Sequence, residues 1–336
     1  MTIKVAINGY GRIGRNIMRA LHEYGWLDRI EIVAINDLGD AATNAHLTKY
    51  DTAHGIFAGD VSVDGGDLIV NGHRVKVLAE RDPAALPWAE LGVDVVYECT
   101  GLFRSKETAG KHLQAGAKKV IVSAPGQDVD NTVVYGVNHK SLKPTDTVIS
   151  NASCTTNCLA PVAKVLHETV GIEHGWLTTT HAYTNNQKLL DVQHKDLRRG
   201  RAAAINIIPA STGAAKAIGL VYPDLAGKLH GAAMRVPVPD GSVCDLTFVS
   251  KRSSSVDELQ KAFVDAAAGS LNGILRATDV PIVSTDIIGE SCSSVVDLPL
   301  IAQVAENFFR VVAWYDNENA YSLRCVDLVE YMVSKA

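Results

Sequence analysis

The stretch Lys4-Val5-Ala6-Ile7-Asn8-Gly9-Tyr10-Gly11-Arg12-Ile13-Gly14 decides the fold of this chain. Its first five residues contain the apolar run Val5-Ala6-Ile7, and three glycines with the spacing Gly-x-Gly-x-x-Gly follow at once. The residues from Arg12 to Tyr24 then have the apolar spacing of a helix. A strand, a glycine-rich turn and a helix in this order predict the first unit of a doubly wound parallel sheet.

Each glycine of this turn has a physical role if the turn binds a dinucleotide. Gly9 makes the tight turn, Gly11 lets the backbone approach a pyrophosphate, and Gly14 lets the helix pack closely on the strand. The helix start offers amides and a favourable dipole to the phosphates. Asp37, 23 residues after Gly14, can accept hydrogen bonds from the adenosine ribose and repels a 2′-phosphate, so NAD is favoured over NADP. The alternative is a turn that serves packing alone, with Asp37 as a helix cap.

The first 150 residues alternate short apolar runs with helical patterns, which predicts a Rossmann domain. Because the apolar runs are nearly continuous, we expect strands that are buried on both faces of a parallel sheet. The predicted strands are Lys4–Asn8, Ile30–Asn36, Asp67–Val70, Val75–Leu78, Val93–Glu98, Lys119–Val122 and Thr147–Ser150. The predicted helices are Arg12–Tyr24, Ala41–Tyr50 and Lys106–Ala115.

After residue 150 the strands become longer and partly alternate between apolar and polar residues. This pattern predicts an α+β domain with a mostly antiparallel sheet, one face of which is covered. The predicted strands are Gly175–Tyr183, Gly231–Pro237, Ser242–Ser250, Ile282–Thr285 and Asn307–Asp316. The predicted helices are Thr155–His167, Gly213–Leu220, Val256–Ala267 and Asn319–Ser334.

Composition excludes several classes of protein. The chain has 336 residues, a formal charge of −5 and 47% hydrophobic residues, which is typical of a globular protein. The acidic balance disfavours a nucleic-acid partner, and no apolar run is long enough to span a membrane. Six cysteines in 336 residues are too few for a disulfide scaffold, and no Cys-x-x-Cys pair suggests a metal site. We therefore expect a cytoplasmic setting and no metal.

Cys154 is the strongest candidate for a nucleophile. It follows a predicted strand and opens a helix within Ser150-Asn151-Ala152-Ser153-Cys154-Thr155-Thr156-Asn157-Cys158. A helix N-terminus stabilises a thiolate, so a lowered thiol pKa is expected. The alternative is a small buried hydrophobe, the usual role of a free cysteine. His181, at the end of a β-branched strand, is the leading candidate for the base that such a nucleophile needs.

Three further segments are suited to anions. His194–Arg201 is a compact basic run, which fits a phosphorylated small molecule or a subunit interface better than nucleic acid. Ser211-Thr212-Gly213-Ala214-Ala215 resembles a hydroxyl-and-amide helix start, and Arg235 needs a carboxylate or phosphate partner in its apolar strand. Together with Cys154 these features predict a thiolate that adds to an aldehyde, hydride transfer to NAD, and a thioester resolved by phosphate or water.

These motifs, with His181-Ala182-Tyr183-Thr184 and Trp314-Tyr315-Asp316-Asn317-Glu318, resemble phosphorylating glyceraldehyde-3-phosphate dehydrogenase over essentially the whole chain. The resemblance implies conversion of glyceraldehyde 3-phosphate and inorganic phosphate to 1,3-bisphosphoglycerate, in glycolysis or gluconeogenesis. It implies an NAD-binding domain at residues 1–153, completed by a C-terminal helix at 317–336, and a catalytic domain at 154–316. It also implies a homotetramer, because segment 185–206 resembles a loop that reaches a neighbouring subunit's cofactor.

The resemblance also implies roles for single residues. Cys154 would be the nucleophile and His181 its base. The residues implied to hold phosphate groups of the substrates are Ser153, Thr155, Thr184, Arg199, Thr212, Gly213 and Arg235. The residues implied to bind NAD are Gly9, Gly11, Arg12, Ile13, Gly14, Asp37, Arg81, Ser123 and Asn317.

The sequence departs from the family at Val192-Gln193, where many NAD-specific members have Leu-Pro, at Asp286–Glu290 and at Asn319-Ala320. Two other functions stay open. Erythrose-4-phosphate dehydrogenase shares the cysteine chemistry but hydrolyses the thioester, and the members of that branch depart from the His181–Thr184 and Ser211–Ala215 motifs kept here. A non-catalytic NAD- or redox-sensing protein would predict loss of a catalytic group or an anion site.

Overall fold

The computed structural model describes residues 2–334 and divides into two compact units. The first unit comprises Met1–Val133, His139–Ala152 and Ser322–Ala336, and the second comprises Val134–Asn138 and Ser153–Tyr321. Residue 1 and residues 335–336, which belong to the domain ranges expected from the sequence, lie outside the described residues.

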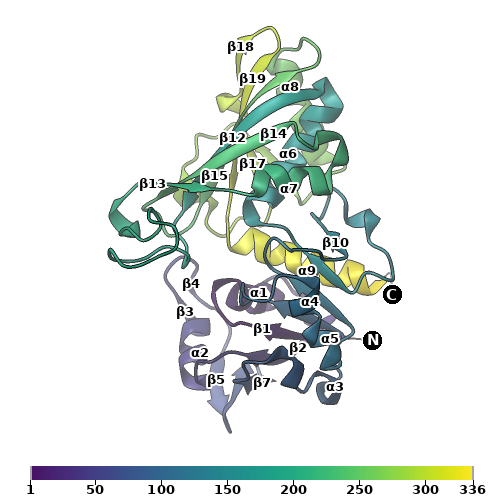
Figure 1. The fold of residues 1–336 in the computed structure, drawn as a ribbon, viewed down its shortest axis with the longest axis vertical. Coiled ribbons are helices and arrows are strands. Elements are labelled where there is room, and N and C mark those ends of the chain that lie inside the picture. Colours follow the sequence, from purple (N-terminus) through teal and green to yellow (C-terminus); the bar gives the residue numbers. More distant parts are fainter. Residues whose placement is uncertain (1, 335–336) are drawn as a thin grey trace. The chain divides into compact units, whose positions relative to one another are not determined.

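The first unit is built on a twisted sheet, part of which is labelled in Figure 1. Its strand order is β10-β11-β9-β8-β1-β2-β7-β6-β5. The strands from β10 to β7 pair in parallel, while β6 pairs antiparallel with both β5 and β7. The strands are β1 (Ile3–Asn8), β2 (Ile30–Asn36), β5 (Val61–Asp64), β6 (Asp67–Val70), β7 (His73–Leu78), β8 (Val95–Glu98), β9 (Lys119–Val122), β10 (Asn131–Thr132) and β11 (Val148–Ser150). A separate short hairpin consists of β3 (Tyr50–Asp51) and β4 (Gly55–Ile56).

Helices connect the parallel strands of this unit. They are α1 (Arg12–Glu23), α2 (Ala41–Lys49), α3 (Trp88–Leu91), α4 (Lys106–Ala109) and α5 (Lys111–Gln114). The single helix predicted over Lys106–Ala115 is split at Gly110, which ends α4 and precedes α5. The strand predicted over Asp67–Val70 exists, but it belongs to an antiparallel edge.

The parallel register brings the carboxyl ends of three strands together. Asn8 at the end of β1 is aligned with Asn36 at the end of β2 and with Glu98 at the end of β8. Ligands of doubly wound sheets bind outside the carboxyl ends of the strands, where the strand order reverses. The glycine turn of residues 9–14 begins directly after Asn8, so it lies at this edge.

The second unit has a mixed, mostly antiparallel sheet with the order β13-β14-β12-β15-β19-β17-β16, and β18 pairs with β19. The pairs β12/β14 and β16/β17 are parallel and the other pairs are antiparallel. The strands are β12 (Ile172–Ala182), β13 (Ile208–Ser211), β14 (Leu229–Val236), β15 (Ser242–Ser250), β16 (Leu275–Thr278), β17 (Ser294–Asp297), β18 (Ala302–Ala305) and β19 (Phe308–Tyr315).

Three helices belong wholly to the second unit: α6 (Cys154–Val170), α7 (Ala214–Val221) and α8 (Val256–Ala268). The long helix α6 packs against both other helices and against β12, β15, β17 and β19. Helix α9 (Asn319–Ser334) begins in the second unit and continues into the first. The fold class predicted from the sequence, a Rossmann sheet followed by a mostly antiparallel sheet, is confirmed.

One predicted strand is wrong. Residues Ile282–Thr285 are not a strand, because a 3-10 turn occupies Ser284–Ile287 instead. The backbone N–H of Val283 donates to the carboxylate of Asp286 at 2.8 Å, and this local bond competes with strand pairing. The helices of residues 2–334 include none with the length and apolar character to cross a membrane.

Candidate active site

In the glycine turn of the first unit, Gly9 and Gly14 have no space for a side chain, because other backbone atoms lie against them. A Cβ on Gly9, which has a φ of +92°, would lie 2.6 Å from the backbone nitrogen of Thr100. A Cβ on Gly14 would lie 2.4 Å from the carbonyl oxygen of Gly9. Gly11 differs, because a Cβ there would meet nothing within 4 Å. The backbone at Gly11 is therefore open on the side where a pyrophosphate could approach.

Asp37 is held at the edge of this turn. Its carboxylate accepts hydrogen bonds from the backbone nitrogens of Tyr10 and Gly39, both at 2.9 Å. Gly11 is the N-cap of α1 and offers no side-chain cap to the first amides of that helix. Uncapped amides, a bare glycine and a fixed acid are the parts that a dinucleotide needs. The residues present therefore fit NAD.

The other predicted cofactor residues of this unit lie near the same strand ends. The guanidinium of Arg12, at the start of α1, forms a bidentate pair with the buried carboxylate of Asp51. Burial alone would raise the pKa of Asp51, but the hydrogen bonds from Arg12 and from the backbone of His54 hold it well below its usual value. Ile13 follows in the first turn of α1. Arg81 is exposed, and Ser123 follows β9 and donates to the carbonyl oxygen of Glu98 at 3.1 Å.

In the second unit, Cys154 is the first residue of α6. Ser153 is the N-cap, and its hydroxyl accepts from the backbone nitrogen of Thr156 at 3.1 Å. Ala152, just before the cap, has a φ of 53°, a left-handed conformation that is rare for a residue with a Cβ. The chain therefore turns sharply before the helix, as it does where a nucleophile must be presented at a helix start.

Cys154 and His181 form a pair. The Nε2 atom of the imidazole lies 3.4 Å from the thiol sulfur, and His181 is buried near the end of β12. Burial raises the pKa of Cys154 to about 11, although the charge of Arg235 and hydrogen bonds from Thr155 act in the opposite direction. Burial and the charge of Arg235 lower the pKa of His181 to about 3. The prediction of a lowered thiol pKa is therefore wrong, because burial raises this pKa more than Arg235 and Thr155 lower it.

Arg235 lies beside this pair, because β14 runs parallel to β12 with Arg235 aligned with His181. Its Nη1 atom donates to the carbonyl oxygen of Ala182 at 2.9 Å and lies 2.6 Å from Nδ1 of His181. The same Nδ1 lies 2.7 Å from that carbonyl oxygen. A guanidinium can only donate hydrogen bonds, so Arg235 and the Ala182 carbonyl compete for opposite protonation states of Nδ1.

A second cation is held by backbone and amide oxygens. Arg199 donates to Asn186 Oδ1 at 3.0 Å and to the carbonyl oxygen of Ser211 at 3.1 Å. It also pairs with Asp196 at 3.3 Å. The structure thus brings Arg199 to the Ser211–Gly213 segment, as a shared anion site requires. Its charge also disfavours the charged form of Arg235, whose pKa burial lowers first.

The remaining residues predicted to bind phosphate differ in their exposure and in the hydrogen bonds that they already make. Thr212 Oγ1 accepts from the backbone nitrogen of Ala214 at 3.2 Å, and Gly213 is the exposed N-cap of α7. Thr184 is exposed, and its backbone nitrogen donates to Gln187. Thr155 is buried, and its hydroxyl is 2.8 Å from the hydroxyl of Tyr315.

Two residues of this site have no role in the sequence interpretation. Tyr315 bonds Thr155 and, at 2.9 Å, Thr179, and its ring packs edge-on against His181 with the centroids 5.8 Å apart. Ser242 donates to Oδ1 of Asn317 at 2.6 Å and accepts from the backbone nitrogen of Ala182 at 3.1 Å. Tyr315 lies in the quoted Trp314–Glu318 motif, so the sequence carried a signal for it. Ser242 lies in none of the quoted motifs, so nothing in the sequence indicated its place in the site.

Comparison with known proteins decides the family. The family model for the NAD binding domain of glyceraldehyde 3-phosphate dehydrogenase matches residues 3–106, and the model for the C-terminal domain of that enzyme matches residues 153–317. The chain is 60% identical over 328 residues to the chromosomal glyceraldehyde-3-phosphate dehydrogenase of Cupriavidus necator, covering 97% of both chains. It belongs to the glyceraldehyde-3-phosphate dehydrogenase family.

Other members of the glyceraldehyde-3-phosphate dehydrogenase family are similar over the same length. The enzyme of Geobacillus stearothermophilus is 54% identical over 336 residues, covering 100% of this chain and 99% of its own. The enzyme of Xanthobacter flavus is 56% identical over 327 residues, covering 97% of both chains. The family resemblance inferred from the motifs is thus confirmed, and so are an NAD-dependent oxidoreductase activity and NAD as the cofactor.

Proposed function

We propose that this chain oxidises D-glyceraldehyde 3-phosphate and phosphorylates it to 1,3-bisphosphoglycerate through a thioester on Cys154. The observation that carries the proposal is the 3.4 Å contact between the thiol of Cys154 and Nε2 of His181, with Arg235 beside it. A thiol, a base and a cation in contact are suited to attack on an aldehyde that carries a phosphate.

The first step forms a carbon–sulfur bond. Because the raised pKa of Cys154 keeps the thiol protonated, Nε2 of His181 takes the proton as the sulfur attacks the aldehyde carbon. The electron pair of the carbonyl moves to its oxygen, which receives the proton back from Nε2 and gives a hemithioacetal. A buried imidazole with a lowered pKa gives the proton up readily, which favours its return to the oxygen.

Oxidation leaves a thioester on the same sulfur. NAD⁺, when bound, supplies the acceptor for the hydride that leaves the former aldehyde carbon. Nε2 of His181 removes the hydroxyl proton, so the oxygen can re-form the carbonyl. The residues proposed to hold NAD are Gly9, Gly11, Arg12, Ile13, Gly14, Asp37, Arg81, Ser123 and Asn317.

Inorganic phosphate then resolves the thioester. A phosphate oxygen attacks the carbonyl carbon, the carbon–sulfur bond breaks, and the sulfur leaves with its electron pair to regain a proton from His181. Arg235 and Thr184 are proposed to bind the phosphate of the triose. Ser153, Thr155, Thr212 and Gly213 are proposed to bind the attacking phosphate, with Arg199 close to both. The bond from Arg199 to the carbonyl of Ser211 supports this grouping.

We also propose the wider setting that the resemblance implies. Residues 1–153 with 317–336 would form the NAD-binding domain and 154–316 the catalytic domain of a cytoplasmic homotetramer, in glycolysis or gluconeogenesis. The segment 185–206 supports a subunit contact, because Leu189, Leu190 and Leu197 in it are 76%, 71% and 85% exposed. We expect no nucleic-acid or membrane partner.

The test is NADH formation at 340 nm with glyceraldehyde 3-phosphate, NAD⁺ and varied inorganic phosphate. Saturable dependence on phosphate is the expected result, and the acyl phosphate is identified by its reaction with hydroxylamine. Erythrose 4-phosphate and NADP⁺ are assayed in parallel. Phosphate-independent turnover that prefers erythrose 4-phosphate would assign the chain to the sister reaction, and NAD binding without turnover of either aldehyde would indicate the binding protein.

A further inference from the structure

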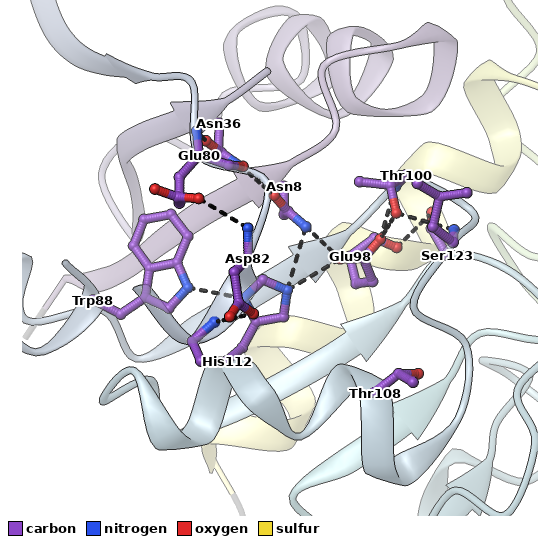
Figure 2. Close-up of polar contacts among 12 residues, drawn as sticks. Asn8, Asn36, Glu80, Asp82, Trp88, Glu98, Thr100, Thr108, His112 and Ser123 are labelled. Carbon is purple, nitrogen blue, oxygen red and sulfur yellow. Dashed lines mark hydrogen bonds and ion pairs between the residues drawn. The ribbon is translucent and has the colours of Figure 1, made fainter. Parts of the chain in front are cut away.

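A buried polar network links the carboxyl ends of β1, β2 and β8 in the first unit (Figure 2). Its centre is the carboxylate of Glu98, which is 1% exposed. One oxygen accepts from Asn8 Nδ2 at 2.6 Å and lies 3.0 Å from Nε2 of His112. The other accepts from the backbone nitrogen of Thr100 at 2.8 Å and from its hydroxyl. Four donors therefore converge on one carboxylate.

The proton on His112 can be placed from its partners. The indole nitrogen of Trp88 donates to Nδ1 of His112 at 2.9 Å, and an indole N–H can only donate. Nδ1 is therefore an acceptor, and the ring proton is on Nε2, from which it is donated to Glu98. The ring is 0% exposed, so no water replaces either partner.

The same directionality extends to the far strand end. Asn8 donates to Glu98 with its amide nitrogen, so its Oδ1 is free to accept from Asn36 Nδ2 at 2.7 Å. Asn36 then uses its own Oδ1 to accept from the backbone nitrogen of Glu80 at 2.8 Å. Asn36 Nδ2 also donates to the carbonyl oxygen of Glu80 at 2.8 Å, so both backbone groups of Glu80 bind this amide. The carboxylate of Glu98 therefore fixes the orientation of Asn8, while Asn8 and the backbone of Glu80 together fix that of Asn36.

The network supports four of the residues proposed to contact NAD, though none of its side chains is among them. Gly9 directly follows Asn8, and Asp37 directly follows Asn36. The backbone nitrogen of Arg81 donates to the carboxylate of Glu80 at 2.7 Å. Ser123 donates to the carbonyl oxygen of Glu98 with both its hydroxyl, at 3.1 Å, and its backbone nitrogen, at 3.0 Å.

We propose that Glu98 is a positioning residue for the cofactor, which fixes the loops after β1, β2, β7, β8 and β9 in the geometry that binds NAD. A glutamine at position 98 would place an N–H group either against the backbone N–H of Thr100 or against the donors of Asn8 and His112. With the new amide nitrogen on the side of Asn8, Asn8 can avoid it only by turning over, which sets its own amide nitrogen against that of Asn36. Asn36 is bound by both the N–H and the carbonyl of Glu80, so a shift of Asn36 strains two bonds to the segment that precedes Arg81. The effect of one charge therefore reaches the loop that carries Arg81.

The test compares Glu98→Gln with Val148→Ala in the full chain. Val148 is buried in a separate hydrophobic cluster of the same unit, so its truncation lowers stability without touching the network. Calorimetry measures the dissociation constants of NAD and of ADP-ribose, and thermal melting measures the loss of stability. We expect Glu98→Gln to raise the dissociation constants of both ligands about tenfold or more, because the network that supports the binding loops is lost. Val148→Ala is expected to change neither dissociation constant by more than about twofold, although its melting temperature falls by a comparable amount.

Kinetics separate positioning from general damage. Glu98→Gln is expected to raise the KM for NAD while leaving kcat at saturating NAD within about threefold, because bound cofactor restores the loops. Alkylation of Cys154 without cofactor serves as a control for the second unit and is expected to be unchanged. If Glu98→Gln does not fold, Asn36→Ala takes its place, because it removes one link of the network without setting two donors against each other. Asn36→Ala is then expected to weaken the binding of ADP-ribose.

Two outcomes would overturn the proposal: NAD affinity within twofold of the original in Glu98→Gln, or an equal loss of affinity in Val148→Ala. The inference rests on the NAD residues named in the proposed function, but it fails separately. Absence of aldehyde turnover in the unmodified chain would refute the proposed reaction and leave the binding comparison valid.

Discussion

Arg235 lies beside His181 across a parallel strand pair, with its Nη1 2.6 Å from the imidazole Nδ1. The guanidinium lowers the pKa of the imidazole, after burial, and also favours the thiolate of Cys154. A residue proposed to bind the substrate's phosphate therefore also tunes the catalytic pair. Occupation of that phosphate site and proton transfer at His181 are coupled through one side chain.

Replacement of Arg235 by glutamine is expected to act on both substrate binding and the thiol. Loss of a charged hydrogen-bond partner predicts a fall in kcat/KM for glyceraldehyde 3-phosphate of about 100-fold or more. The kcat/KM for glyceraldehyde, which has no phosphate, is expected to fall much less. Because the charge favours the thiolate, the pH profile of Cys154 alkylation should move to higher pH in the variant. An unchanged profile would show that Arg235 and Cys154 are not coupled.

Cys154→Ser is expected to abolish turnover and leave NAD affinity intact. The hydroxyl keeps the contact with His181, but it is a far weaker nucleophile, so a loss of roughly 10⁴-fold is expected. Cys292→Ser is the matched control, because Cys292 is a partly exposed cysteine of the same unit that forms no disulfide. Absorbance at 340 nm and calorimetry with NAD measure the two effects. Comparable activity in Cys154→Ser would refute the nucleophile assignment.

Asp37→Asn is expected to change cofactor choice. The amide can still accept a hydrogen bond, but the charge that repels a 2′-phosphate is lost. We expect the ratio of kcat/KM for NADP to that for NAD to rise about tenfold, through a weaker NAD and a stronger NADP interaction. Val192-Gln193 are left unchanged in this test. A constant ratio would indicate that discrimination resides elsewhere.

Asp51 is expected to make stability depend on pH in the acid range. Its pKa in the folded protein is well below its usual value, so it stabilises the fold above the unfolded pKa of about 3.8, and this contribution is lost as the pH falls. Asp51→Asn should therefore lower the free energy of unfolding at pH 7 by about 1 kcal/mol or more. The difference should shrink towards pH 3. Urea unfolding at pH 7, 5 and 3 measures it, and a difference that grows in acid would contradict the assignment.

The sequence was sufficient for the features that depend on local chemistry. The tight turn and the close approach of the backbone follow from the spacing of Gly9, Gly11 and Gly14. The parallel sheet follows from the continuous apolar runs. Local breaks were harder to predict. Gly110 divides one apolar pattern into two short helices. Val283 and Asp286 bond to each other through both the side chain and the backbone of Asp286, and a 3-10 turn forms where a β-branched run predicts a strand.

Other features depend on contacts between distant segments. The pKa of Cys154 depends on how deeply the thiol is buried, which the helix start alone cannot predict. Ser242 joins Asn317 to Ala182 only because β15 lies beside β12. The Glu98 network likewise depends on the alignment of three strand ends.

Helix α9 has a consequence for how the protein is made on the ribosome. Residues 322–334 belong to the first unit, and Leu323, Val326 and Val329 among them are buried, yet they follow the whole second unit in the sequence. The first unit therefore cannot be completed until the whole second unit has been translated. Closing so long a loop is slow, and the incomplete unit is exposed to aggregation meanwhile. Premature termination before residue 322 would leave a full second unit beside a first unit that cannot be completed.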